Sequence, residues 1–331
     1  MLDHLQNDIS IYQGKELPEE WKNDLIEKCY FKLFLPKHLG GKQFNLTDAG
    51  KCLVATAKIN ASLGWVHNLI AGANYFCYFF SQETANKLFS VKNAITCGSG
   101  QVNGAVTSKN NQFIIHGNWS KCSGADLATY FTVNAKDENG VVRSYLVPKE
   151  FVTIKKDWKS FGLQLTSTDS IEIENGIIPK SYQFEIGNLK WGEDYYVAKL
   201  NFELFARFCL SATLEGIFRG MLNAFCTDFL PAKNKKTEEI VNHAFAKADE
   251  LNTKRTAIDK ELQKQFDFSD EITFNALNQF CSLANIHLEL YEIASKLYFY
   301  AGIRASETTN LFHWWYRDFQ TACLHHFVRP N

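Results

Sequence analysis

The stretch "QFIIHGNWSKCSGADLATYFTVNA", residues 112–135, decides the fold because it belongs to a segment whose pattern is not helical, between two segments whose pattern is helical. Its two runs rich in β-branched and aromatic residues, "QFIIHGNW" and "ATYFTVNA", are typical of strands. The same texture continues in "VVRSYLVP", "FVTIKK" and "SIEIENGIIP", and the segments "KNNQ" and "KDENG" supply turn chemistry. We therefore predict a small antiparallel sheet domain over residues 94–192.

Helical periodicity flanks this segment on both sides. Residues 17–93 are predicted to be helical, with a break at "LPKHLGGKQFN" and a nearly apolar, buried helix from Leu46 onward. The fold class is α+β, with a helical domain over residues 1–93, the β domain, and an antiparallel four-helix bundle over residues 193–331. The four bundle helices are predicted at residues 196–229, 237–266, 270–303 and 311–328.

Composition excludes several classes of function. The 331 residues carry 35 Lys and Arg against 36 Asp and Glu, so the chain lacks the basic excess of a protein that binds nucleic acid or a membrane surface. No apolar run reaches the roughly 18 residues of a membrane span, and the polar, acidic start "MLDHLQNDIS" is unlike a signal peptide. Nine scattered cysteines without metal-ligand spacing are typical of reduced thiols. We expect a soluble cytoplasmic protein.

Four local motifs resemble acyl-CoA dehydrogenases and follow the order of that family along residues 17–328. The resemblance implies a helical N-terminal domain, a middle antiparallel β-barrel-like domain and a C-terminal four-helix bundle. It also implies a flavin, FAD or FMN, between the middle and C-terminal domains of a homodimer or homotetramer. The motifs are "LFLPKHLGGKQFNLTDA", "AVTSKNNQFIIHGNWSKCSGADLATYF", "WKSFGLQLTSTDSIEIENGIIP" and "YAGIRASETTNLFHWWYRDFQ".

The catalytic glutamate of acyl-CoA dehydrogenases is missing from both of its usual places. Desaturation of an acyl thioester needs a carboxylate that removes the α proton while the flavin accepts hydride. The family places this glutamate eight residues after the Asp of an Arg-Asp pair, and the eighth residue after Asp318 is His326. A minority of members place it before a bundle arginine, and Ala206 precedes Arg207.

The two-component flavin monooxygenases of the same superfamily resemble the chain more closely. Their "G-x-W-x-x-x-SG" motif is matched by Gly117, Trp119, Ser123 and Gly124, and their histidine near the end of an "R-D" segment is matched best by His325. The resemblance implies that the serine lies beside the flavin and that the histidine is a neutral base near pH 7. These enzymes hydroxylate phenols or heterocycles with oxygen and with flavin from a separate reductase.

The candidate site therefore combines residues of three kinds. Ser123 and His325 are candidate catalytic residues, and His67 and His326 are candidates for the substrate pocket. A metal site is not predicted, because the histidine pair lacks a third ligand at helical spacing. The candidate cofactor-binding residues are Trp119, Ser123, Gly124, Thr166 and Thr168.

Each candidate also has a plainer interpretation. Ser123 suits a turn, Trp119 and His67 suit the core, and the two threonines suit any strand. The histidine pair suits packing or the surface. Adjacent residues of a helix point about 100° apart, so one helix would direct only one histidine of the pair into a pocket. We favour His325, which lies seven residues after Asp318 and on the same helical face.

Two further alternatives stay open: an acyl-CoA dehydrogenase, and a non-catalytic scaffold or partner subunit that has lost flavin binding. The scaffold is suggested by the segment "CTDFLPAKNKKTEEI". It lacks the arginine that the resemblance implies for the flavin pyrophosphate, and leaves only Lys233, Lys235 and Lys236 as substitutes. Arg317 and Asp318 are expected to form a buried ion pair at the last helix.

Overall fold

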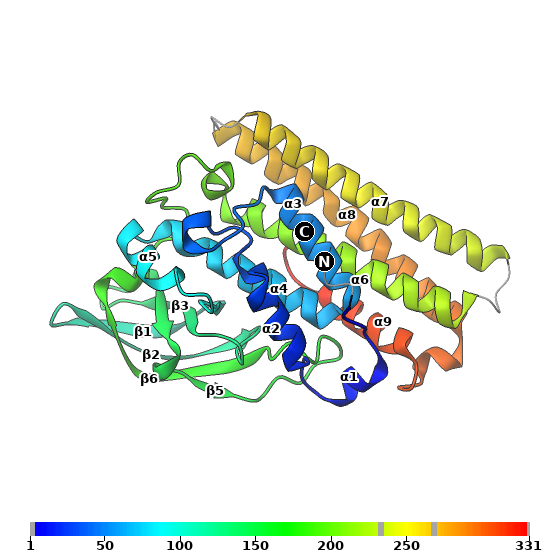
Figure 1. Ribbon diagram of the computed structural model, residues 1–331, viewed down its shortest axis with the longest axis horizontal. Coiled ribbons are helices and arrows are strands. Elements are labelled where there is room, and N and C mark those ends of the chain that lie inside the picture. Colours follow the sequence, from blue (N-terminus) through cyan, green and yellow to red (C-terminus); the bar gives the residue numbers. More distant parts are fainter. Residues whose placement is uncertain (1–3, 231–234, 266–269, 330–331) are drawn as a thin grey trace.

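A computed structural model of the chain describes residues 4–230, 235–265 and 270–329 (Figure 1). A sheet lies at one side of the molecule and two long helices, α7 and α8, lie at the other (Figure 1). Three helices, α3, α4 and α6, pack between them. The bounds of these helices are Leu46–Ile59 for α3, Ala61–Asn74 for α4, Phe202–Asp228 for α6, Lys235–Lys264 for α7 and Asp270–Ala301 for α8.

The apolar segment from Leu46 onward forms two helices rather than the one predicted. Asn60 separates α3 from α4 with an extended backbone, φ −153° and ψ 134°. Its side-chain oxygen accepts a hydrogen bond from the Leu63 amide at 3.0 Å and so caps the start of α4. The remaining N-terminal helices are α1 (Ile9–Gln13), α2 (Glu19–Glu27) and α5 (Gln82–Phe89).

The middle segment forms a seven-stranded sheet with the order β5-β6-β2-β1-β3-β4-β7. It is not wholly antiparallel as predicted, because β1 and β3 pair in parallel. The sheet is open, and closure into a barrel is not seen among the described residues. The strands are β1 (Thr96–Lys109), β2 (Gln112–Cys122), β3 (Tyr130–Lys136), β4 (Val142–Pro148), β5 (Thr153–Lys155), β6 (Asp169–Pro179) and β7 (Gln183–Phe184).

Strand β1 lies outside the predicted strand runs because glycine interrupts its apolar pattern. Gly104 in this strand makes room for the indole of Trp119 on β2. A Cβ atom at position 104 would lie 2.2 Å from Trp119 Cζ2, so only glycine fits there without displacement. The tryptophan is fully buried.

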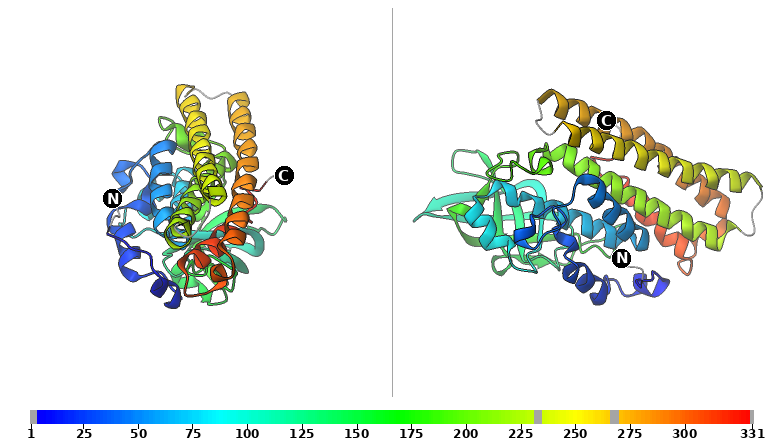
Figure 2. Two further views of the ribbon diagram at one scale, coloured as in Figure 1. Left: turned by 90° about the vertical axis from the view of Figure 1, so that its right-hand side faces the viewer. Right: turned by 45° about the horizontal axis from the view of Figure 1, so that its top comes forward.

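Helix α6 is the centre of the C-terminal part and packs against α3, α4, α7, α8 and α9 (Leu311–Ala322). Helices α7 and α8 run side by side on the outside of the molecule (Figure 2). The last helix ends at Ala322 and not near residue 328 as predicted. Residues 323–329 form turns instead, with the Val328 amide donating to the His325 carbonyl at 3.0 Å.

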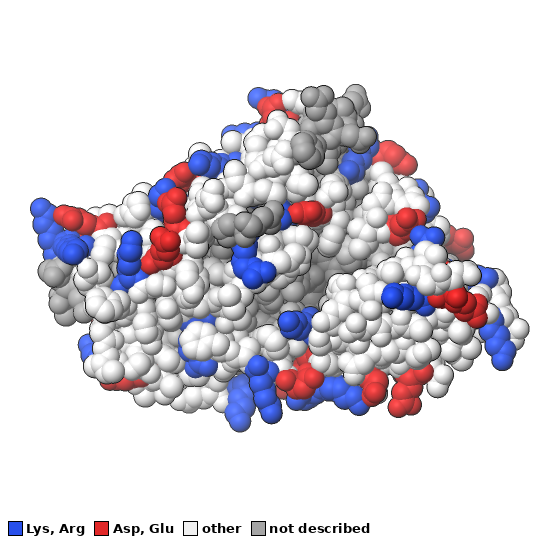
Figure 3. Space-filling model, turned by 180° about the vertical axis from the view of Figure 1, so that it is seen from behind, with Lys and Arg blue, Asp and Glu red and all other residues white. Residues whose placement is uncertain are grey.

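The surface carries charges of both signs. On the face shown in Figure 3, Lys and Arg lie interspersed with Asp and Glu among uncharged residues. Within the described ranges, no helix combines the length and the apolar character that a membrane span requires.

Candidate functional site

A cavity of about 250 Å³ lies where α4, β1, β3, α6 and the C-terminal turns meet. Apolar side chains such as Leu69, Phe76 and Phe205 form much of its wall. Its described lining residues include neither a carboxylate nor a lysine or arginine. The polar residues of the wall are Asn68, Ser99, Ser123, Thr132, Asn134, Ser144, His325 and His326.

The C-terminal turns reach this cavity because two buried side chains hold their backbone. Arg207 on α6 donates from Nη1 to the Phe327 carbonyl at 2.8 Å, and its guanidinium lies 5.3 Å from the centre of that phenyl ring. His287 on α8 donates from Nδ1 to the Val328 carbonyl at 2.9 Å. These contacts explain why the chain leaves the helix after Ala322: bundle side chains bind the carbonyls of residues 327 and 328.

His325 is neutral in this environment. Burial first, and then the nearby charges of His326, Arg329 and Arg207, lower the pKa of His325 to about 4. Its Nδ1 accepts a weak hydrogen bond from the Phe327 amide at 3.3 Å, so the proton of the neutral ring resides on Nε2. In this tautomer the histidine offers an N–H donor rather than a base.

His326 also lines the cavity, which corrects the expectation that only one histidine of the pair could do so. That expectation required both residues to lie on a helix, and the helix ends before them. The two imidazole rings are stacked with centroids 4.6 Å apart. Burial and the neighbouring Arg207 lower the pKa of His326.

Ser123 lies just beyond β2, after a sharp turn in the backbone. Lys121 has a positive φ of 63° and Gly124 a positive φ of 78°, and together they turn the Ser123 side chain toward the cavity. The indole N–H of Trp65 on α4 donates to Ser123 Oγ at 3.3 Å. The same indole meets the ring of His325 edge-on at 5.8 Å. Trp65 therefore contacts both candidate catalytic residues.

Thr166 and Thr168 lie behind Ser123 and not in the cavity wall. Thr168 Oγ1 is 2.8 Å from Ser123 Oγ and 2.6 Å from Thr166 Oγ1. The Gly124 amide donates to the Thr166 carbonyl at 2.8 Å, which ties the loop of the threonines to the turn that carries Ser123.

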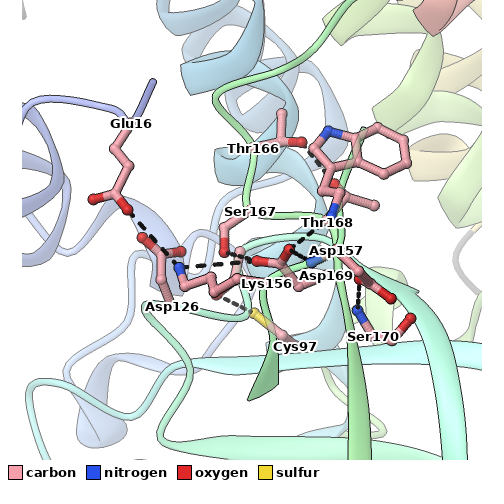
Figure 4. Close-up of polar contacts among 12 residues, drawn as sticks. Glu16, Cys97, Asp126, Lys156, Asp157, Thr166, Ser167, Thr168, Asp169 and Ser170 are labelled. Atoms are coloured by element: carbon pink, nitrogen blue, oxygen red, sulfur yellow. Dashed lines mark hydrogen bonds and ion pairs between the residues drawn. The ribbon is translucent and has the colours of Figure 1, made fainter. Parts of the chain in front are cut away.

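Asp169 holds the loop that carries Thr166 and Thr168 in place through hydrogen bonds (Figure 4). Its carboxylate accepts hydrogen bonds from the amides of Asp157 and Trp158, both at 3.0 Å, and from Ser167 Oγ at 2.7 Å. The positions of Thr166 and Thr168 therefore rest on a dense set of hydrogen bonds.

Two of the predicted site residues lie in the core and not in the cavity wall. The Trp119 indole is fully buried and donates to the Asn134 carbonyl at 3.0 Å. His67 is fully buried too, and its Nε2 donates to the Tyr30 carbonyl at 2.9 Å while Nδ1 lies 2.8 Å from Thr56 Oγ1. Burial lowers the pKa of His67 to about 4. Both of its nitrogens are satisfied, so the expectation that it lines the substrate pocket is corrected.

The expected buried ion pair between Arg317 and Asp318 does not form. Asp318 points into the protein, where it accepts from the Leu163 amide at 2.6 Å and from the Tyr12 hydroxyl at 3.2 Å. Burial outweighs these bonds and raises the pKa of Asp318 to about 7. Arg317 points outward and donates to the Phe161 carbonyl at 2.6 Å, because neighbours on a helix face different directions.

Sequence reasoning missed three residues that build the site: Trp65, Arg207 and His287. Arg207 had a signal, since it interrupts an apolar run of α6. The other two had none, because their partners lie 58 and 41 residues away in the chain. Of the expected substitutes for the pyrophosphate arginine, Lys235 and Lys236 lie at the start of α7 and outside the cavity wall, and Lys233 lies outside the described residues.

Solved structures of a hydroxylase and of a monooxygenase have this same fold and match nearly the whole chain. The 3-HSA hydroxylase from Rhodococcus sp. RHA1 has a TM-score of 0.85 at 18% identity, over 96% of this chain and 88% of that structure. The dibenzothiophene monooxygenase TdsC from Paenibacillus sp. A11-2 has a TM-score of 0.80 at 19% identity, over 94% and 87% of the two chains. XiaF from Streptomyces sp., solved with FADH2 and glycerol, has a TM-score of 0.83 at 14% identity, over 96% and 86%.

Curated relatives match a smaller part of the chain. The oxygenase subunit HsaA of a flavin-dependent monooxygenase from Rhodococcus jostii is 25% identical over 170 residues, which are 50% of this chain and 44% of the relative. A pigment production hydroxylase from Rhodococcus sp. is 25% identical over 167 residues, 49% of this chain and 43% of the relative. The matched region thus spans less than half the length of these relatives. No protein-family model matches the chain.

Proposed function

We propose that the chain is the oxygenase component of a two-component flavin monooxygenase. It would hydroxylate a small aromatic or heterocyclic substrate with oxygen and with reduced FAD or FMN from a separate flavin reductase. The observation that carries the proposal is the cavity wall, which brings Ser123 and His325 together and has no carboxylate among its described residues. Acyl thioester desaturation needs such a carboxylate, whereas oxygen transfer to a ring needs a pocket that excludes water and does not need a carboxylate.

The residues of the cavity suit the ring system of a flavin. Asn68 lines the wall and is almost fully buried, and its Nδ2 has no hydrogen-bond partner among the described residues. A buried amide left without a partner is costly, and a ring carbonyl of a bound ligand would satisfy it. The phosphate groups must lie beyond the described wall, which supplies no cation for them.

Reduced flavin, when bound, would supply the activation of oxygen. The protein would contribute positioning and polarity. His325, neutral and protonated on Nε2, would donate a hydrogen bond within the pocket, and Ser123 would contact the flavin. His326, at the exposed side of the pair, would contact the substrate. Gly124, Thr166 and Thr168 would support the flavin contact through Ser123 and not by touching the flavin themselves.

An anaerobic experiment separates this function from that of an acyl-CoA dehydrogenase. Purified protein loaded with oxidised flavin is mixed with a panel of acyl-CoA thioesters, and the flavin absorbance is followed. The proposal predicts that the flavin stays oxidised with every thioester. Bleaching by any acyl-CoA would show that an α proton and a hydride can be removed, and the oxygenase proposal would then be wrong.

The proposal also covers the oligomeric state and the cellular location of the protein. We infer a homodimer or homotetramer, supported by Phe299 near the end of α8 and Ile303 just beyond that helix, which are 80% and 84% exposed. Light scattering of the purified protein tests it. The sheet would serve as the barrel-like middle domain over residues 94–192, between helical domains over residues 1–93 and 193–331. All nine cysteines are free thiols, which supports a cytoplasmic setting.

A further inference from the structure

A chain of three buried hydroxyl groups runs from the cavity wall into the protein. Ser123 Oγ is 2.8 Å from Thr168 Oγ1, which is 2.6 Å from Thr166 Oγ1 (the two threonines are shown in Figure 4). Thr166 Oγ1 is in turn 2.8 Å from the carbonyl oxygen of Leu163. Each of these three oxygen–oxygen contacts needs a proton, because bare lone pairs repel at such distances.

The protons can be placed by counting, since three hydroxyl groups supply three protons. The Leu163 carbonyl has none, so Thr166 must donate to it. Thr168 must then donate to Thr166, and Ser123 must donate to Thr168. Ser123 thus donates its only hydroxyl proton to Thr168 and has none left to donate into the cavity. Ser123 Oγ also accepts a hydrogen bond from the Trp65 indole N–H. One lone pair of this oxygen therefore remains to accept a hydrogen bond from a ligand in the cavity.

We infer that Thr166 is a positioning residue, because it fixes the polarity of this hydroxyl chain so that Ser123 offers an acceptor to a bound ligand. The ligand atom that meets Ser123 is then an N–H or O–H donor. The identity of that ligand rests on the proposed function. Reduced flavin carries an N–H donor on its ring system that oxidised flavin lacks, so this polarity would favour the reduced form.

The preference has a finite size. If the three hydroxyl groups donated in the opposite direction, Ser123 would donate into the cavity, and the hydrogen bond from Thr166 to the Leu163 carbonyl would be lost. That carbonyl would keep the hydrogen bond from the Trp158 indole at 2.8 Å, so reversal costs at least one neutral hydrogen bond. A net hydrogen bond of this kind corresponds to a preference of about tenfold for a donor over an acceptor.

The Trp65 indole reports the polarity without any flavin. In protein labelled with ¹⁵N at tryptophan, the seven tryptophans give indole N–H signals, and Trp65→Phe identifies the one from Trp65. Ser123→Ala removes the acceptor and should move this signal most. Thr166→Val leaves Thr168 with Ser123 as its acceptor, so Ser123 takes a second donor and its bond from Trp65 weakens. The signal should then move in the same direction as in Ser123→Ala, by a smaller amount.

Two further variants separate polarity from a change in packing. Thr166→Ser keeps the hydroxyl and should return the signal to its wild-type position. Thr132→Val is the matched control, because Thr132 also lines the cavity but donates to the Cys97 carbonyl and not to this chain. The inference would be overturned if the Trp65 signal did not move in Thr166→Val, or if it did not return to its wild-type position in Thr166→Ser. If the Trp65 signal did not move in Ser123→Ala, the hydrogen bond from Trp65 to Ser123, on which the inference rests, would be contradicted.

Flavin titration distinguishes this failure from failure of the proposed function. The affinity of the wild type for reduced flavin, divided by its affinity for oxidised flavin, should fall by about tenfold in Thr166→Val and recover in Thr166→Ser. An unchanged ratio would contradict the inference while leaving the function intact. If the wild type bound no flavin in either state, the function would be wrong and the indole signals alone would decide the polarity.

Discussion

The guanidinium of Arg207 on α6 donates a 2.8 Å hydrogen bond to the backbone oxygen of Phe327, 120 residues later in the chain. This contact holds the turns that carry His325 and His326 against the cavity. Arg207 is almost fully buried and pairs with Glu203 at 2.8 Å, so its position is itself well defined. Together with His287, a side chain outside the cavity wall thus determines the placement of two candidate site residues.

Arg207→Met should loosen the C-terminal turns while keeping the aliphatic packing. Because displaced site groups lose catalytic effect steeply, we expect substrate hydroxylation to fall by about tenfold or more. Turnover with reduced flavin and oxygen measures it, and circular dichroism checks the fold. Arg219→Met is the matched control, since Arg219 lies on the same helix and pairs with Glu215 and Asp249 instead. Equal losses in both variants would contradict a specific role for Arg207.

His325→Ala should lower turnover by on the order of a hundredfold, the usual scale for a lost proton-handling or hydrogen-bonding group. Both histidines line the cavity, so His326→Ala should now cause a measurable loss as well, of less than about tenfold. Steady-state kinetics of the two variants compare them directly. A larger loss for His326→Ala would show that the roles are reversed, and small, equal losses would assign the pair to packing.

Asp318→Asn should change how stability depends on pH. Burial raises the pKa of Asp318 to about 7 from 3.8, so the folded protein holds a proton that the unfolded chain has lost between these values. This residue therefore lowers the free energy of unfolding as pH rises from about 4 to about 7. The variant, compared with the wild type by urea unfolding, should gain on the order of 2–4 kcal/mol between pH 4 and pH 7.5.

An exposed aspartate provides the control for this effect. Asp249→Asn changes the same chemical group where its side chain is 70% exposed, so it shows how much of any change comes from an aspartate that is not buried. If Asp318→Asn differed from the wild type by the same free energy at pH 4 and at pH 7.5, the buried carboxyl would not be the source of the pH dependence.

Gly104→Ala should destabilise the sheet, because the new Cβ would lie 2.2 Å from Cζ2 of the buried Trp119. Overpacking of this kind costs about 1–3 kcal/mol of the free energy of unfolding. Denaturant unfolding measures the loss. Gly100→Ala on the same strand is the control, since a Cβ there has no atom within 4 Å. A Gly104→Ala protein as stable as the control would mean that β1 and β2 do not pack in this register.

Periodicity was enough to predict the α+β class, five of the strands and the four C-terminal helices. It failed where tertiary contacts override local pattern. Strand β1 is rich in glycine because Trp119 needs space at Gly104. The last helix ends early because Arg207 and His287 bind the carbonyls of Phe327 and Val328. Neither cause can be read from neighbouring residues.

The candidate site shows the same division. The "SG" of the motif and the C-terminal histidines could be found from resemblance, and Ser123, His325 and His326 do meet at one cavity. Trp119 and His67 carry the same local signals but face the core, because the direction of a side chain depends on what packs against it. The hydroxyl chain through Thr168 and Thr166 has no local sequence signal, because Ser123 and Thr168 are 45 residues apart in the chain.

Anaerobic titration of the purified protein with reduced FMN and with reduced FAD, followed by flavin fluorescence, tests the central claim most directly. The account predicts saturable binding of at least one of them in the micromolar range or tighter, weakened in Ser123→Ala and little changed in Ser120→Ala on the neighbouring strand β2. Absence of saturable binding by the wild type with either flavin, in the reduced and the oxidised state, would contradict it and favour the scaffold that has lost its cofactor.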